Sequence, residues 1–194
     1  PVKEQMVLDG TFPTVKSPNP ENPEGFYLAV DLAKEVGSDL ILGTDPDSDR
    51  VGVMVRGADG EYHTITGNQM GVLLLDYIIT ARRRKGTLPE NAAAISTIVT
   101  SKMVRRICDV NDIHFDETFT GFKFMAEKLA EYQRDGSYQY VLAFEESYGY
   151  MMGDYVRDKD AVTACVMITE MAAYYFEQGM TLAQALDALY EKYG

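Results

Sequence analysis

Apolar residues recur along this chain with two spacings, which predict helices and strands in alternation. Ala29, Leu32, Ala33 and Val36 lie three or four positions apart and indicate one face of a helix. Short apolar runs next to glycine or aspartate, such as 39–43, indicate buried strands. Helices are expected at 23–36, 67–85, 102–110, 122–132, 161–176 and 182–190. Strands are expected at 39–43, 51–55, 93–99, 114–117 and 138–144.

The alternation is regular in the second part of the chain, where each expected strand is followed by a helix. Such an order favours right-handed crossovers and a largely parallel sheet between layers of helices. Thr66 and Gln69 form a capping box, which marks the start of a new helix. We therefore expect an α/β fold with a domain boundary near residue 61, which divides the chain into 1–61 and 62–194.

Polar segments follow three of the expected strands at the point where each strand ends. They are 100–102, 118–123 and 145–149, and each contains hydroxyl or charged side chains. In open α/β sheets, ligands bind outside the carboxyl ends of the strands. Each segment alone has the composition of an ordinary connection, but three of them at one edge indicate a single site.

Composition excludes some functions. The formal net charge is −12, which disfavours a general nucleic-acid binder because such a protein needs a basic face. No apolar run approaches the roughly 20 residues that a membrane span requires. Cys108 and Cys165 lie far apart among apolar residues and favour free thiols in a cytoplasmic protein. The chain starts at Pro1 without an initiator methionine, so we expect a piece of a longer protein.

The segment between the first two expected strands is strongly acidic. Asp45, Asp47 and Asp49 alternate, and alternate residues of an extended segment point the same way. Three gathered carboxylates repel one another unless a cation lies among them, and oxygen ligands favour Mg²⁺, Mn²⁺ or Ca²⁺. A solvated acidic turn is the alternative. An EF-hand loop is disfavoured because Arg50 and Arg56 stand where it needs Gly and Glu.

A second pair of polar residues, Glu145 and Ser147, follows an apolar strand. A carboxylate beside a hydroxyl suits the vicinal hydroxyls of a sugar, which both donate and accept hydrogen bonds. A helix N-terminus lined with acids would have a similar composition. Glycoside hydrolysis by Glu145 and Glu146 is disfavoured, because adjacent residues at a strand end point apart.

Several motifs together resemble the α-D-phosphohexomutase superfamily. The acidic segment D-P-D-S-D-R at 45–50 is similar to the metal-binding loop of that family, and F-P-T-V-K-S-P-N-P-E at 12–21 is similar to the segment before it. F-E-E-S-Y-G at 144–149 resembles its sugar-binding loop. T-G-F-K at 120–123 and R-D-K-D at 157–160 resemble two further substrate segments. The implied fold is a three-layer α/β/α sandwich with a mixed, largely parallel sheet, preceded by part of a similar domain.

The resemblance also implies roles for individual residues. Asp45, Asp47 and Asp49 would hold Mg²⁺, and Arg50 would help to neutralise a phosphate. In the sugar site, Glu145 and Ser147 would hold the 3- and 4-hydroxyls of a hexose. Further substrate contacts would come from Thr120, Gly121, Lys123 and Arg157. Lys159 would act as general acid and base, which requires a lowered pKa, and we expect Arg157 and Lys123 to supply the neighbouring cations.

The activity that the resemblance implies is the interconversion of glucose 1-phosphate and glucose 6-phosphate through a phosphoserine and a 1,6-bisphosphate. The sequence contains neither the family's phosphoserine segment nor its C-terminal phosphate loop. We therefore expect this piece to be inactive without the remaining domains. A mannose or pentose preference, a Mg²⁺-dependent hydrolase, and a non-catalytic module that binds sugar phosphate or a divalent cation are the alternatives.

Overall fold

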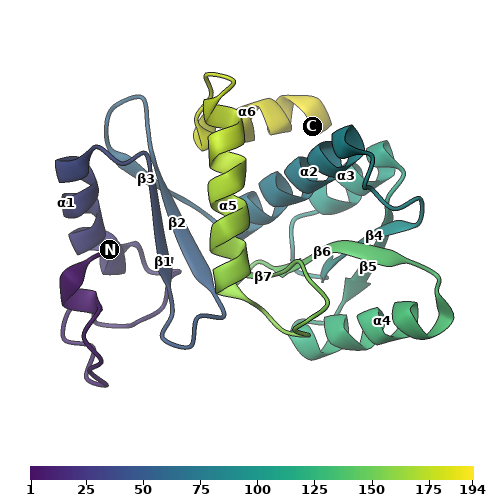
Figure 1. The fold of residues 1–194 in the computed structure, drawn as a ribbon, viewed down its shortest axis with the longest axis horizontal. Helices are drawn as coiled ribbons and strands as arrows, with labels where there is room; N and C mark the ends of the chain where they lie inside the picture. Colours follow the sequence, from purple (N-terminus) through teal and green to yellow (C-terminus); the bar gives the residue numbers. More distant parts are fainter.

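Two β-sheets lie side by side in the computed structural model, which describes all 194 residues, and helix α5 (Ala161–Phe176) stands between them (Figure 1). The first sheet is antiparallel, in the order β1-β2-β3. Its strands are β1 (Leu40–Thr44), β2 (Val51–Arg56) and β3 (Tyr62–Ile65). The acidic segment joins β1 to β2, so this hairpin fixes both ends of the segment.

The second sheet has the order β5-β4-β6-β7. Strand β4 pairs in parallel with both β5 and β6, whereas β7 pairs antiparallel with β6. The strands are β4 (Ala92–Thr97), β5 (His114–Thr118), β6 (Gln139–Glu145) and β7 (Gly149–Met151). The parallel arrangement brings the carboxyl ends of β4, β5 and β6 to one edge, as the alternation of elements predicted.

Helices cover both faces of the second sheet (Figure 1). On one face, a core cluster of 31 buried residues joins the sheet to α5 and three further helices. These helices are α2 (Gly67–Lys85), α3 (Met103–Asn111) and α6 (Leu182–Tyr193). On the other face, α4 (Phe122–Asp135) packs through Met125 and Leu129 against Ile95 and Ala143. The predicted α/β fold with helix layers on both sides of a mixed sheet is therefore confirmed.

Helix α1 (Tyr27–Val36) covers the outer face of the first sheet. It follows a 3-10 turn at Pro23–Phe26 and ends at Gly37, whose φ of 71° is the left-handed conformation that glycine adopts readily. Phe26 and Ala33 pack against Ile41 and Met54 of this sheet. The inner face of β2 joins the large core, because Val51, Val53 and Val55 belong to the cluster of the second sheet. The two sheets thus share one continuous core.

The boundaries of the expected elements agree with the structure to within a few residues, but two strands were not predicted. Strand β3 has a mixed sequence, and β7 is only three residues long. The boundary expected near residue 61 lies in the turn between β2 and β3, which pair with each other. The division into 1–61 and 62–194 stays a prediction.

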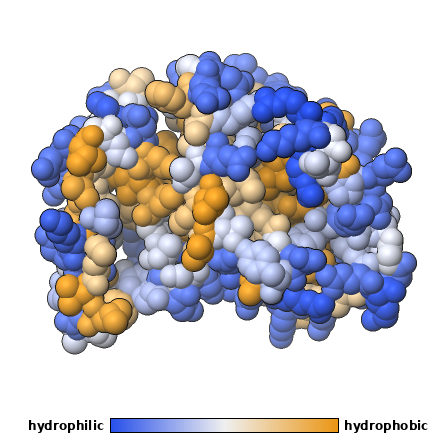
Figure 2. All heavy atoms as spheres, viewed as in Figure 1, coloured by the Kyte–Doolittle hydropathy of each residue, from blue (hydrophilic) through white to orange (hydrophobic).

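The surface over the first sheet differs in character from the surface near α3 and α4. Figure 2 shows apolar side chains over the first sheet and along α5, while the edge near α3 and α4 is mainly hydrophilic. Val162 and Val166 of α5 are 65% and 63% exposed. None of the helices combines the length and apolar character needed to cross a membrane.

Candidate active site at the rim shared by the two sheets

The acidic loop doubles back on itself around Asp45, which is only 4% exposed. One oxygen of its carboxylate accepts hydrogen bonds from the backbone N–H groups of Asp49 at 3.1 Å and Arg50 at 3.0 Å. The other oxygen accepts from Nε of Arg50 at 2.8 Å. Burial opposes the charge of Asp45, but these donors together hold its pKa below the usual value. Asp45 is therefore both a charged group of the loop and the support that shapes it.

The three aspartates of the loop gather at one point. Asp45, Asp47 and Asp49 each offer a carboxylate oxygen, and these oxygens lie within 4.8 Å of one another. Burial raises the pKa of Asp49, and the Asp45 carboxylate adds to this effect, although Lys159 opposes it. Asp47 is exposed and makes no hydrogen bond within the protein. A set of three carboxylate oxygens fits a hard divalent cation such as Mg²⁺, which prefers oxygen ligands.

The predicted sugar loop begins at the last residue of β6. Glu145 is 6% exposed, and its Oε1 accepts a hydrogen bond from the backbone N–H of Gly121 at 2.6 Å. Ser147 donates from its hydroxyl to Oε2 of Glu145 at 3.2 Å. The structure thus brings the loop before α4 and the loop after β6 together. Thr120, next to Gly121, is exposed at the same rim.

Backbone pairing joins the acidic loop to the sugar loop. Arg50 forms an antiparallel bridge with Gly149, and the N–H of Val51 donates to the carbonyl of Tyr148 at 3.1 Å. The N–H of Ala161 donates to the carbonyl of Ser48 at 3.0 Å, which ties the start of α5 to the same loop. The triad and the Glu145 loop are therefore parts of one rim.

Lys159 lies at the junction of the two loops, but its environment differs from the prediction. Its Nζ is 3.0 Å from a carboxylate oxygen of Asp49 and 3.2 Å from one of Asp158. Burial favours the neutral amine, yet these carboxylates raise the pKa of Lys159. The expectation of a pKa lowered by Arg157 and Lys123 is therefore wrong in this conformation, because the nearest charges are negative.

The two expected neighbours of Lys159 point elsewhere. Arg157 is exposed, and its guanidinium donates to the side-chain oxygen of Gln133 on α4 at 2.6 Å. The Nζ of Lys123 is exposed and lies 4.8 Å from the centre of the Phe124 ring. The structure does not bring these two cations to the triad or to Glu145.

Sequence reasoning missed several residues that shape the rim. Gly149 lets the side chain of Lys159 cross the backbone, because a methyl group there would overlap the lysine side chain. Glu21 lies 3.5 Å from the Arg50 guanidinium. Both belong to motifs noted in the sequence, but only the folded chain shows what they contact.

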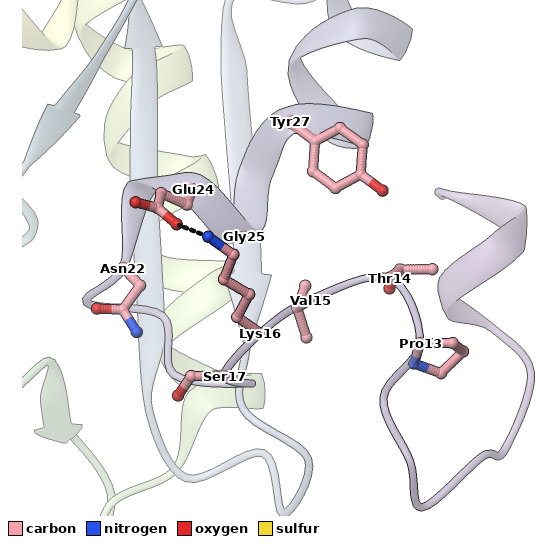
Figure 3. Close-up of a pocket in the computed structure, with 9 residues that line it drawn as sticks. All are labelled: Pro13, Thr14, Val15, Lys16, Ser17, Asn22, Glu24, Gly25 and Tyr27. Carbon is pink, nitrogen blue, oxygen red and sulfur yellow. Dashed lines mark ion pairs between the residues drawn. The ribbon is translucent and has the colours of Figure 1, made fainter.

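A separate hollow of about 370 Å³ lies between residues 13–17 and the start of α1. Figure 3 shows its lining, in which the one ion pair joins Lys16 to Glu24 at 3.8 Å. Both side chains are almost fully exposed. This hollow therefore holds no gathered set of catalytic groups comparable to the rim.

Comparison with known proteins finds matches along the whole chain. Residues 66–193 match phosphoglucomutase/phosphomannomutase α/β/α domain III, and residues 1–60 match α/β/α domain II of the same family. The chain is 37% identical over its whole length to a phosphopentomutase from Mus musculus and to a phosphoglucomutase from Staphylococcus aureus. It spans 32% and 34% of the length of these two relatives.

Solved structures share the fold. A phosphoglucomutase/phosphomannomutase family protein from Burkholderia thailandensis matches 94% of this chain and 35% of its own with a TM-score of 0.69 and 19% identity. The open form of parafusin, a phosphoglucomutase from Paramecium, matches 91% of this chain and 30% of its own with a TM-score of 0.63 and 19% identity. The chain belongs to the phosphoglucomutase/phosphomannomutase family and carries its domains II and III.

Proposed function

We propose that this chain forms the cation-binding and sugar-binding part of an enzyme that interconverts glucose 1-phosphate and glucose 6-phosphate. The observation that carries the proposal is the shared rim, where backbone pairing between Arg50 and Gly149 joins the loop of the three gathered aspartates to the loop of Glu145. Phosphoryl transfer depends on positioning and on neutralisation of charge. A rim that joins cation ligands to a sugar loop supplies both.

In the proposed site, Asp45, Asp47 and Asp49 hold Mg²⁺, and Arg50 faces the phosphate. A bound divalent cation would neutralise negative charge on the transferring group. Arg50 already forms ion pairs with Asp45 and Glu21, so its guanidinium is held at the triad before any ligand arrives. A solved structure of the same fold, N-acetylphosphoglucosamine mutase from Aspergillus fumigatus, is a complex with GlcNAc-6P and magnesium.

The hexose would bind at the Glu145 loop. Glu145 and Ser147 would exchange hydrogen bonds with two sugar hydroxyls, and Thr120 and Gly121 would contact the ring from the neighbouring loop. Lys123 and Arg157 would have to turn from their present partners to reach the substrate phosphate. Lys159, which carries its proton in this structure, is the candidate for proton donation. Its Nζ lies 3.0 Å from Asp49 of the acidic loop, and its side chain crosses Gly149 of the sugar loop.

The relatives are about three times as long as this chain. We infer that the remaining domains of the complete enzyme supply the phosphoserine and a phosphate-binding loop, and that the division near residue 61 separates two domains. Phosphopentomutase activity is the second candidate, because the mouse phosphopentomutase is as similar to the chain as the bacterial phosphoglucomutase. Initial rates with glucose 1-phosphate and ribose 1-phosphate decide between the two sugars.

The metal and activity assignments are tested together by Asp47→Asn in the complete enzyme. Asp47 is exposed and makes no hydrogen bond, so the fold should be unaffected. Mutase turnover should fall by at least about 100-fold, because a ligand of the catalytic cation is lost. Glu35→Gln, which removes one exposed charge from α1, is the matched control and should leave turnover unchanged. Near-normal turnover of Asp47→Asn would contradict the proposal.

A further inference from the structure

Glu146 lies between the two residues proposed to hold the sugar, but its side chain turns away from them. Its Oε2 accepts hydrogen bonds from the hydroxyl of Thr97 at 2.8 Å and from the hydroxyl of Thr100 at 3.4 Å. Both threonines are buried, at 1% and 8% exposure, and both lie at the carboxyl end of β4. Adjacent side chains at a strand end point to opposite sides, which explains why Glu145 and Glu146 face different groups.

The two threonines form a closed unit with the carboxylate. Their hydroxyl oxygens are 2.8 Å apart, and the backbone N–H of Thr97 donates to the hydroxyl of Thr100 at 3.2 Å. Hydrogen bonds to a charged acceptor are stronger than those between neutral groups. Glu146 therefore ties the turn after β6 to the end of β4.

The backbone of the same turn is held from other directions. Gly67, the first residue of α2, packs so closely that a methyl group there would overlap the carbonyl oxygen of Glu146. Tyr148 has a φ of 69°, a conformation that is costly for a bulky residue and persists only where the surroundings impose it. Its carbonyl accepts the hydrogen bond from Val51. The turn is thus fixed at β2, at α2 and, through Glu146, at β4.

We propose that Glu146 is a positioning residue for the sugar site. Its bonds to Thr97 and Thr100 fix the turn, which keeps the Glu145 carboxylate against the N–H of Gly121 and the Ser147 hydroxyl beside it. A site whose groups are held before the ligand arrives loses less conformational freedom on binding. The inference rests on the proposed function, because it concerns the orientation of the groups that would hold the hexose.

The first test needs no ligand and uses hydrogen exchange at the Gly121 amide, followed by NMR on the 194-residue chain. Glu146→Ala removes the acceptor of both threonine hydroxyls, and exchange at Gly121 should be about tenfold faster because the turn opens more often. Glu146→Gln keeps an oxygen that accepts from Thr97, and exchange should stay within about threefold of the original rate. Thr97→Val removes the stronger donor and should give a rate between these two.

The second readout is the dissociation constant of the complete enzyme for glucose 6-phosphate in the presence of Mg²⁺. It should rise about tenfold in Glu146→Ala and about threefold or less in Glu146→Gln. Asp76→Ala is the matched control, because it removes a buried carboxylate that accepts from a hydroxyl far from this loop. It should leave sugar-phosphate binding unchanged and accelerate exchange at Gly121 less than Glu146→Ala does, because it destabilises the fold without touching the turn.

The outcomes separate the two proposals. If the complete enzyme does not bind glucose 6-phosphate, the assignment of the sugar site fails, while Gly121 exchange still decides the role of Glu146. Equal acceleration at Gly121 in Glu146→Ala and Asp76→Ala would show general destabilisation and overturn the positioning role. Unchanged exchange in Glu146→Ala would also overturn it. If Glu146→Ala does not fold, the comparison of Thr97→Val with Glu146→Gln decides. Identical exchange rates at Gly121 in these two variants would count against the inference.

Discussion

Carboxylates occur in two contrasting settings in this protein, at the rim and inside the fold. At the rim, the oxygens of Asp45, Asp47 and Asp49 come within 4.8 Å of one another. Inside the fold, Asp76 on α2 stands alone among donors. It accepts from the hydroxyl of Tyr193 at 2.5 Å and from the ammonium of Lys192 at 2.8 Å.

The two settings differ in the hydrogen-bond donors and cations that surround each carboxylate. Asp76 has its own cation and its own hydroxyl, and the Tyr193 hydroxyl in turn accepts from Asn111 at 3.0 Å. This network joins α2, α3 and α6. At the rim, Asp47 has no partner, and Lys159 reaches only Asp49 of the three. Like charges held together without enough cations cost stability, so their arrangement indicates a ligand rather than a role in the core.

The largest effect is expected at the rim, from replacing Lys159. In the complete enzyme, Lys159→Ala should lower the maximal rate by about 100-fold or more, while KM changes by less than about threefold, because proton transfer is lost and sugar contacts remain. Lys159→Arg keeps the ion pair with Asp49 but cannot release a proton, so it should be equally slow. Lys34→Ala, which removes an exposed lysine paired with Glu61, is the control.

A different pattern would change the role of Lys159. If Lys159→Arg restored the rate, a positive charge beside Asp49 would be sufficient. If KM rose far more than the rate fell, Lys159 would be a binding residue. Both results would leave the comparison between rim and interior intact but would remove the proton-transfer assignment.

A smaller effect is expected inside the fold. Asp76→Ala should lower the free energy of unfolding by about 2 kcal/mol, because the buried Tyr193 hydroxyl and the Lys192 ammonium lose their shared acceptor. Urea denaturation measures this change, with Asp187→Ala on the exposed face of α6 as the control. Sugar-phosphate binding at the rim should be unaffected. Loss of sugar-phosphate binding in a folded Asp76→Ala protein would show that the two settings are coupled.

The sequence allowed most elements of the fold and the position of the rim to be predicted. Helical spacing marked α2 through Met70 and Leu73, and both are fully buried. The position of the rim followed from the parallel order of β4, β5 and β6, because parallel strands place their carboxyl ends together. The gathering of the three aspartates followed from their alternation along the chain.

Contacts between residues far apart in sequence could not be predicted in the same way. Nothing near Lys159 in the sequence indicates that Asp49 will be its partner, since this pair depends on how α5 docks between the two sheets. The three residues of β7 carry too little pattern to indicate a strand, and their pairing with β6 becomes evident only after folding. The contact of Arg157 with Gln133 on α4 likewise depends on packing between segments far apart in the sequence.

The smallest expected effect concerns a second carboxylate away from the rim, the half-buried Asp116 on β5. Burial opposes its charge, but the hydroxyl of Tyr132 at 2.6 Å, together with Lys128 and His114, lowers the pKa of Asp116. The unfolded chain therefore binds this proton more readily than the folded chain does. The contribution of Asp116 to stability is full above the ordinary aspartate pKa of about 3.9 and is lost as the pH falls through the lower folded pKa.

Urea denaturation at pH 7 and pH 3 should therefore show a smaller acid-induced loss of stability in Asp116→Asn than in the original chain. The difference should be below about 1 kcal/mol, because the ion pairs around Asp116 are partly exposed. Phe115→Leu on the same strand leaves the carboxylate in place and should keep the original pH dependence. An equal loss in Asp116→Asn would mean that Tyr132 and Lys128 stabilise this carboxylate no more than water does, and the contrast between rim and interior would then rest on Asp76 alone.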